Sequence, residues 1–138
     1  MKALIIALSV LSLTGCATSA TDPAKAKLAP KDRVYSYQEP IDNGATLTVI
    51  RDHGMLGAGC YYGFYINKKR AASLSTSERA DFKLPAGEWM LGFKGEGKLC
   101  IADDFINERE VVLKPGQHKG VRLSADPSGN LDIRPISL

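Results

Sequence analysis

Short segments of alternating apolar and polar residues, each followed by a turn, recur along most of this chain. Residues 45–51 alternate in this way, with Leu47 and Val49 on one side of the backbone. A period of two is typical of strands that bury one face. Turn signals separate such segments at intervals of about eight to twelve residues, and no helical period is sustained. The pattern predicts an all-β domain, a small antiparallel β-sandwich of about seven strands.

Turn residues divide the pattern into the expected strands. These are residues 45–51, 60–66, 80–84, 88–93, 110–113, 121–123 and 131–136, and further candidates are residues 33–39 and 70–74. Pro85-Ala86-Gly87 predicts a hairpin between 80–84 and 88–93. Pro115-Gly116 repeats this arrangement and suits a type II turn, because Pro fixes the first central φ and Gly accepts a positive φ at the second.

An apolar run precedes this pattern at the N-terminus. Lys2 supplies one positive charge, and residues 3–13 are apolar apart from two serines. About eleven residues of helix span only about 16 Å, roughly half of a hydrocarbon core, so a transmembrane helix is not expected. A charged start, a short apolar middle and small residues at the end are typical of a secretory signal.

The run ends in Leu13-Thr14-Gly15-Cys16, which resembles the lipobox of bacterial lipoproteins. The resemblance implies that residues 1–15 are a signal peptide and that Cys16 receives the acyl chains. Two or three chains hold a domain on a bilayer, whereas one gives marginal binding. Ala17 stands where an Asp in the family favours the inner membrane, so the resemblance implies the outer membrane, on its periplasmic side. The alternative is an ordinary secretory signal with a chance cysteine.

Residues 16–32 are expected to be the lipidated cysteine and a flexible tether, followed by the sandwich domain at 33–138. Ala, Thr, Lys and Pro dominate this segment, which has almost no large apolar groups. As a coil it would reach roughly 20 Å, enough to hold the domain clear of the headgroups. A solvated tether is the preferred interpretation, although its basic residues could touch anionic lipids; these are Lys25, Lys27, Lys31 and Arg33.

Two further cysteines, Cys60 and Cys100, form an even pair in a compartment that would be oxidising. We expect a disulfide between them, on different strands where it could join the two sheets. Closing a loop of about forty residues would stabilise the fold by roughly 4 kcal/mol. The alternatives are two separate buried thiols or a redox pair, and the latter usually has a C-x-x-C spacing that is missing here.

The polar residues form no recognisable catalytic or metal-binding motif. His53 and His118 are the only histidines and have no partners at ligand spacing, and the adjacent Asp103 and Asp104 would point apart on a strand. The formal net charge of +3 is interspersed along the chain, so no nucleic-acid partner is expected. The sequence thus predicts no enzyme, no metal and no cofactor.

One strand offers a candidate binding surface. If Tyr62 and Phe64 point into the core, Tyr61 and Tyr65 point outward on either side of Gly63. Two tyrosines around a glycine would make a flat platform able to stack on sugar rings or to anchor a protein partner. The alternative is a pair of ordinary cross-strand side chains with no ligand.

A second resemblance covers about a quarter of the chain. Phe64-Tyr65-Ile66-Asn67 and Phe82-Lys83-Leu84-Pro85-Ala86-Gly87-Glu88-Trp89 are similar to segments of the small PEGA-like β-sandwich domains and of related bacterial lipoproteins. This resemblance implies an Ig-like or PEGA-like sandwich in the cell envelope and brings no active site. Lys68 and Lys69 depart from the Gly-containing turn that is common there.

Together these features predict a lipid-anchored envelope lipoprotein whose domain binds or scaffolds without catalysis. Its expected partners are the membrane, through Cys16, and either envelope proteins or peptidoglycan. One alternative is a structural subunit of an envelope complex, and another is an envelope hydrolase with an unrecognised site.

Overall fold

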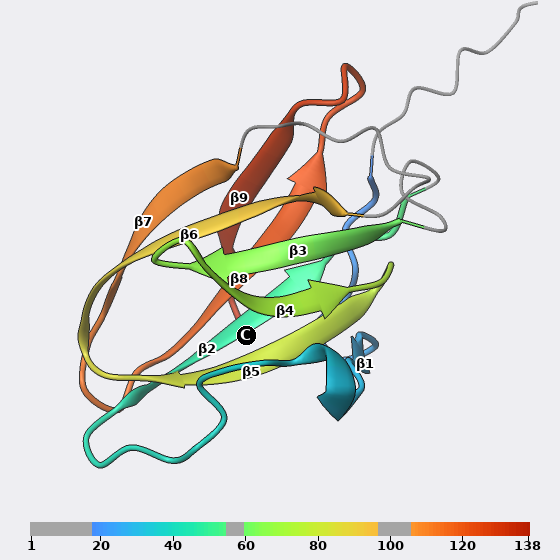
Figure 1. Ribbon diagram of the computed structural model, residues 1–138. Coiled ribbons are helices and arrows are strands. Elements are labelled where there is room, and N and C mark those ends of the chain that lie inside the picture. Colours follow the sequence, from blue (N-terminus) through green and yellow to red (C-terminus); the bar gives the residue numbers. More distant parts are fainter. Residues whose placement is uncertain (1–17, 55–59, 97–105) are drawn as a thin grey trace, which may run out of the picture.

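The protein is an all-β sandwich, as the sequence predicts (Figure 1). The computed structural model describes residues 18–54, 60–96 and 106–138. The elements of these parts of the chain are β1 (Lys27–Leu28), the 3-10 turn η1 (Lys31–Arg33), β2 (Ala45–Arg51), β3 (Tyr61–Ile66), β4 (Lys69–Leu74), β5 (Glu78–Leu84), β6 (Gly87–Glu96), β7 (Asn107–Leu113), β8 (His118–Ala125) and β9 (Leu131–Ile136). No helix within those residues has the length and apolar character needed to cross a membrane.

The two sheets of the sandwich differ in how their strands pair. The four-stranded sheet, ordered β4-β3-β6-β7, is antiparallel throughout. The five-stranded sheet, ordered β1-β5-β2-β8-β9, is mixed, because β1 runs parallel to β5 and β2 runs parallel to β8. The sequence predicts only antiparallel pairing. That prediction fails where neighbours in the sheet are far apart in the chain, since no tight turn then sets their relative direction.

The prediction of hairpins at Pro85-Ala86-Gly87 and Pro115-Gly116 is wrong. The strands on either side of each turn lie in different sheets, so β5 and β6, and likewise β7 and β8, do not pair with each other. Both turns carry the chain across the core from one sheet to the other. The turn chemistry at Pro115-Gly116 is nevertheless as expected, because Gly116 has φ +72° and the Gln117 amide donates to the Lys114 carbonyl at 3.1 Å.

The core lies between the sheets and consists of the inward half of each alternating strand. Phe64 on β3 and Phe82 on β5 are fully buried, and their ring centroids are 5.5 Å apart across the two layers. Tyr62 and Phe93 make a second ring contact at 5.2 Å within the four-stranded sheet. Aromatic pairs at such distances add about 0.5–1.5 kcal/mol each to the effect of burial.

The segment expected to be a flexible tether is instead attached to the sandwich from Thr18 onward. Thr21 and Ala29 are buried, and β1 extends the five-stranded sheet along β5. The Ala29 amide donates to the Arg79 carbonyl at 2.9 Å, one of several backbone bonds along this segment. Composition predicts a tether because large apolar groups are few; the segment is held by backbone hydrogen bonds, which composition does not reveal.

Arg33 fixes the far end of the same segment. Its guanidinium donates to both carboxylate oxygens of Glu78, at 2.7 and 2.6 Å, and to the Ser73 carbonyl at 2.9 Å. Burial alone would raise the pKa of Glu78, but the hydrogen bond from Arg33 keeps that pKa below its usual value. A fork of two charge-assisted bonds between partly buried groups is among the stronger polar contacts in proteins.

Arg51, at the end of β2, joins the two sheets. It is 1% exposed, and its Nη1 donates to the carbonyls of Cys60 and Leu74 at 2.6 and 2.7 Å. Those carbonyls belong to the residue just before β3 and to the last residue of β4, in the opposite sheet. The guanidinium also lies 3.9 Å from the ring centroid of Tyr62. Burial lowers the pKa of Arg51, yet an arginine stays protonated in proteins, so the contacts are charge-assisted.

We predict that Arg51→Met lowers the free energy of unfolding by about 3 kcal/mol, because two buried carbonyls lose a charged donor. Arg51→Lys should give an intermediate loss, since an ammonium group keeps the charge without the planar fork. Urea denaturation measures both values. The control is Arg109→Met, whose exposed guanidinium makes one 3.3 Å contact with Asp132 and should change stability by less than about 0.5 kcal/mol. Equal stability of the Arg51→Met and control variants would contradict this role.

Candidate functional site

Tyr61 and Tyr65 lie on the outer face of the four-stranded sheet, as the alternation of β3 predicts. Tyr62 and Phe64 point into the core, Tyr61 is 44% exposed, and Tyr65 is half-buried. The structure therefore brings the two candidate tyrosines onto one surface. Their surroundings differ from the flat platform that the sequence predicts.

The side chain of Glu96 fills the space above Gly63 between the two tyrosines. Gly63 is buried, and a Cβ placed on it would collide with the Glu96 carboxylate. That carboxylate accepts hydrogen bonds from the Tyr65 hydroxyl at 2.7 Å, from Arg70 at 2.6 Å and from Ser73 at 3.2 Å. A side chain at position 63 would displace the Glu96 carboxylate from this place, so glycine is what lets the carboxylate lie against the backbone. The hydroxyl of Tyr65 is therefore engaged within the protein.

Cationic groups cover the rings on the same surface. The guanidinium of Arg33 lies 4.9 Å from the ring centroid of Tyr61, and the Lys94 ammonium lies 5.8 Å from that of Tyr65. We call this set the tyrosine–arginine surface; it comprises Arg33, Tyr35, Tyr61, Tyr65, Arg70, Lys94 and Glu96. Each cation gains from the ring quadrupole, so a sugar ring would have to displace a cation to stack here. Arg and Tyr are enriched at protein interfaces, so this arrangement is more typical of a protein-binding surface than of a sugar-stacking one.

Tyr65 has a perturbed acidity. Burial and, after it, the hydrogen bond and negative charge of Glu96 together raise the pKa of its hydroxyl to about 12. Ionised tyrosine would face the carboxylate at close range, so the neutral form is favoured. Tyr65 is accordingly a hydrogen-bond donor, and it stays protonated throughout the physiological range.

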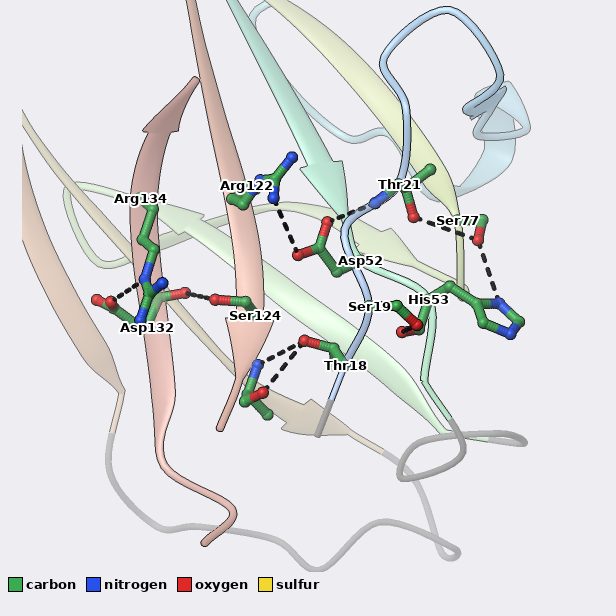
Figure 2. A network of polar contacts seen from close by, with 11 residues as sticks. Thr18, Ser19, Thr21, Asp52, His53, Ser77, Arg122, Ser124, Asp132 and Arg134 are labelled. Carbon is green, nitrogen blue, oxygen red and sulfur yellow. Dashed lines mark hydrogen bonds and ion pairs between the residues drawn. The ribbon is translucent and has the colours of Figure 1, made fainter. Parts of the chain in front are cut away.

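A second polar arrangement lies at the end of the sandwich where the N-terminal segment meets β2 and β8 (Figure 2). Ser19 and His53 exchange backbone hydrogen bonds of 2.6 and 3.1 Å. Thr18 and Ala125 are joined by their amides and by the Thr18 hydroxyl, at 3.0–3.2 Å. Beside these contacts is a cavity of about 550 Å³, lined by side chains of both charges; they include Asp52, Arg122, Asp132 and Arg134.

Asp52 is the buried centre of this arrangement. It is 3% exposed, accepts the Thr21 amide at 3.1 Å, and lies 3.9 Å from Nη1 of Arg122. Burial raises the pKa of Asp52, and the Thr21 amide and the charge of Arg122 oppose that shift. The Nε of Arg122 is buried without a hydrogen-bond partner among the described residues. Asp52 lies just after β2, and the alternation of residues 45–51 gives no indication that the next residue is a buried carboxylate.

The two histidines occupy separate places. His53 is exposed, with Nδ1 at 3.4 Å from the hydroxyls of Thr76 and Ser77. Nε2 of His118 lies 2.8 Å from the hydroxyl of Thr48, which donates to Asp81 at 2.6 Å. Because that hydroxyl has only one hydrogen, Nε2 of His118 must be the donor, and it is not a base for Thr48.

Several predicted residues lie outside the described part of the chain. These are Cys16, Cys100, Asp103 and Asp104. Cys60 is described and is buried just before β3, but its pairing with Cys100 stays a prediction, as does the lipidation of Cys16. Within the described ranges, no group of three or more His, Cys, Asp or Glu side chains is arranged to hold a metal ion.

Comparison with known proteins assigns no family to this fold and these surfaces. No family model matches the chain, and no curated protein has a similar sequence. The resemblances to bacterial lipoproteins and to PEGA-like domains remain predictions.

We predict that Glu96→Gln lowers the pKa of Tyr65 below about 12, while burial keeps it above its ordinary value of 10.0. Ultraviolet titration of tyrosinate measures the change, with Tyr65→Phe identifying the transition. A raised pKa in the folded state stabilises the protein below pH 10, and this contribution is lost as the pH rises from about 10 to about 12. The loss of stability over that interval should be smaller in Glu96→Gln. An unchanged Tyr65 transition would show that Glu96 has no part in it.

Proposed function

We propose that this chain is a lipid-anchored protein of the cell envelope, in which a non-catalytic sandwich domain binds or scaffolds a partner. Acyl chains on Cys16 would hold it at the outer membrane, on the periplasmic side. The proposal rests on the apolar run that ends in Leu13-Thr14-Gly15-Cys16.

One structural observation is compatible with this processing and carries the proposal further. Thr18, two residues after Cys16, is held by the domain through its amide and hydroxyl, which are bonded to Ala125. Cleavage before Cys16 would therefore remove none of the contacts described above.

The tyrosine–arginine surface is the binding face that we propose. Tyr61 and Tyr65 offer large apolar rings, and Arg33 and Arg70 are held in place by carboxylates, so little side-chain freedom would be lost on binding. The ring faces already carry cations, which favours a protein partner over a stacked sugar. An envelope protein is accordingly preferred to peptidoglycan as the partner. This also keeps the structural-subunit alternative open, since a subunit would use the same surface.

A hydrolase is the less favoured alternative. The one histidine beside a buried hydroxyl, His118, donates to Thr48, and that hydroxyl is already bonded to Asp81. A nucleophile needs a neighbouring base that accepts its proton. Here the histidine instead donates a hydrogen bond to the hydroxyl. No catalytic role is assigned to these residues.

The anchor is tested by intact mass and by fractionation. The mature protein should be heavier than residues 16–138 by the mass of its acyl groups, because lipidation follows cleavage. Cys16→Ser should leave the membrane fraction and accumulate with altered processing of the leader. A Cys16→Ser protein that stays on the membrane with its leader removed as before would refute the proposed anchoring.

The binding face is tested by crosslinking in intact cells. We expect the double variant Tyr61→Ala, Tyr65→Ala to lose its crosslinked partners several-fold, because truncated aromatic anchors dominate binding losses. Arg109→Ala, on β7, is the matched surface control and should retain them. Sedimentation with purified peptidoglycan tests the other expected partner. Undiminished crosslinking by the double variant would exclude this surface.

A further inference from the structure

The first described residues of the chain run across one end of the sandwich. Thr18 is bonded to Ala125 at the end of β8, and Ser19 is bonded to His53 just after β2. Thr21 follows, with its amide on the Asp52 carboxylate, and the Lys27 amide then donates to the Ser77 carbonyl just before β5. The segment therefore crosses from β8 past β2 to β5 and is bonded to each in turn (Figure 2).

Covalent geometry places Cys16 close to this end of the domain. Only one residue separates Cys16 from Thr18, and an extended chain spans at most about 3.6 Å per residue, so their Cα atoms lie within about 7 Å of each other. A tether running to residue 32 would have allowed roughly 20 Å. Attachment of the segment at Thr18 removes nearly all of that slack.

We infer that the protein stands on the bilayer with this end against the lipid headgroups. The inference rests on the proposed anchoring at Cys16. We call this surface the anchored end; it comprises residues 18–25, 52–54 and 126–130. Its exposed side chains are polar or small and include Asp22, Lys25, Ser128 and Asn130, which suit the headgroup region. The turns at residues 67–68, 85–86 and 114–117 form the distal end, which faces away from the membrane.

This orientation fixes how partners can approach. The strands run from the anchored end to the distal end, and the seven residues of β5 alone extend about 23 Å at about 3.3 Å per residue. Both outer sheet faces therefore stand upright on the membrane. The tyrosine–arginine surface is on one of them, so it would meet a partner that approaches along the membrane plane.

Fluorescence quenching by labelled lipids tests the orientation. The lipidated protein, purified from membranes, is reconstituted into vesicles of phosphatidylethanolamine and phosphatidylglycerol that carry a nitroxide on some headgroups. A fluorophore is attached at Ser128→Cys on the anchored end or at Ala86→Cys on the distal end, both exposed turn positions. The unsubstituted protein, taken through the same labelling, gives the background from its other cysteines.

We expect the fluorophore at position 128 to be quenched several-fold more strongly than the one at position 86. Equal quenching at both positions, or stronger quenching at 86, would overturn the inferred orientation. The same labels on Cys16→Ser should show no quenching. Lipidated protein that failed to stay on the vesicles would count against the anchoring itself, so the two failures are distinguishable.

A linker variant tests whether attachment of the segment sets the height of the domain. Ten Gly and Ser residues inserted between Ala17 and Thr18 keep every described contact and add a coil that reaches about 17 Å. Quenching at position 128 should then fall toward that at position 86. Unchanged quenching would overturn the claim that the short connection to Thr18 holds this end on the membrane.

Discussion

The buried guanidinium of Arg51 is the contact on which the two layers of the sandwich depend most directly. Arg51 is on β2 of one sheet and donates to carbonyls that flank β3 and β4 of the other. The next two residues, Asp52 and His53, connect the end of β2 to the N-terminal segment. Asp52 binds the Thr21 amide, and His53 pairs with Ser19, so three consecutive residues connect both sheets and the N-terminal segment. The end of β2 is thus where the separate parts of the fold meet.

This junction changes how an anchor on Cys16 would act. A free tether would let the domain rotate and meet partners at any angle, whereas a segment attached from Thr18 would pass the constraint of an anchor to the whole sandwich. The buried Asp52 contributes to that attachment because its carboxylate needs the Thr21 amide once it has left water. Stability at one end of the fold and orientation on a membrane would then have a common physical origin.

The tyrosine–arginine surface illustrates the limits of strand alternation. Alternation places Tyr61 and Tyr65 outward correctly, since side chains on a strand point to opposite faces in turn. It gives no information on what lies above Gly63, because Glu96 comes from a strand thirty-three residues away in sequence. The same holds for Arg33, which reaches Tyr61 only because the N-terminal segment is attached to β5. The surface that one strand predicts to be uncovered is therefore covered by side chains from other parts of the chain.

The sequence by itself determined the all-β class, the position of most strands and the inward residues of each, because these depend on a local period of two and on local turn chemistry. Residues 45–51 and 131–136 are strands within the expected bounds for this reason. Only the tertiary structure decided which strands pair, that the turns after β5 and β7 cross between sheets, and that residues 18–33 are part of the domain. Those choices depend on hydrogen bonds and buried charges between residues distant in the chain, such as Arg51 with Leu74 and Thr21 with Asp52. A single sequence contains no local signal for such pairs, because neighbouring residues do not reveal whether an Arg or Asp will be buried or exposed.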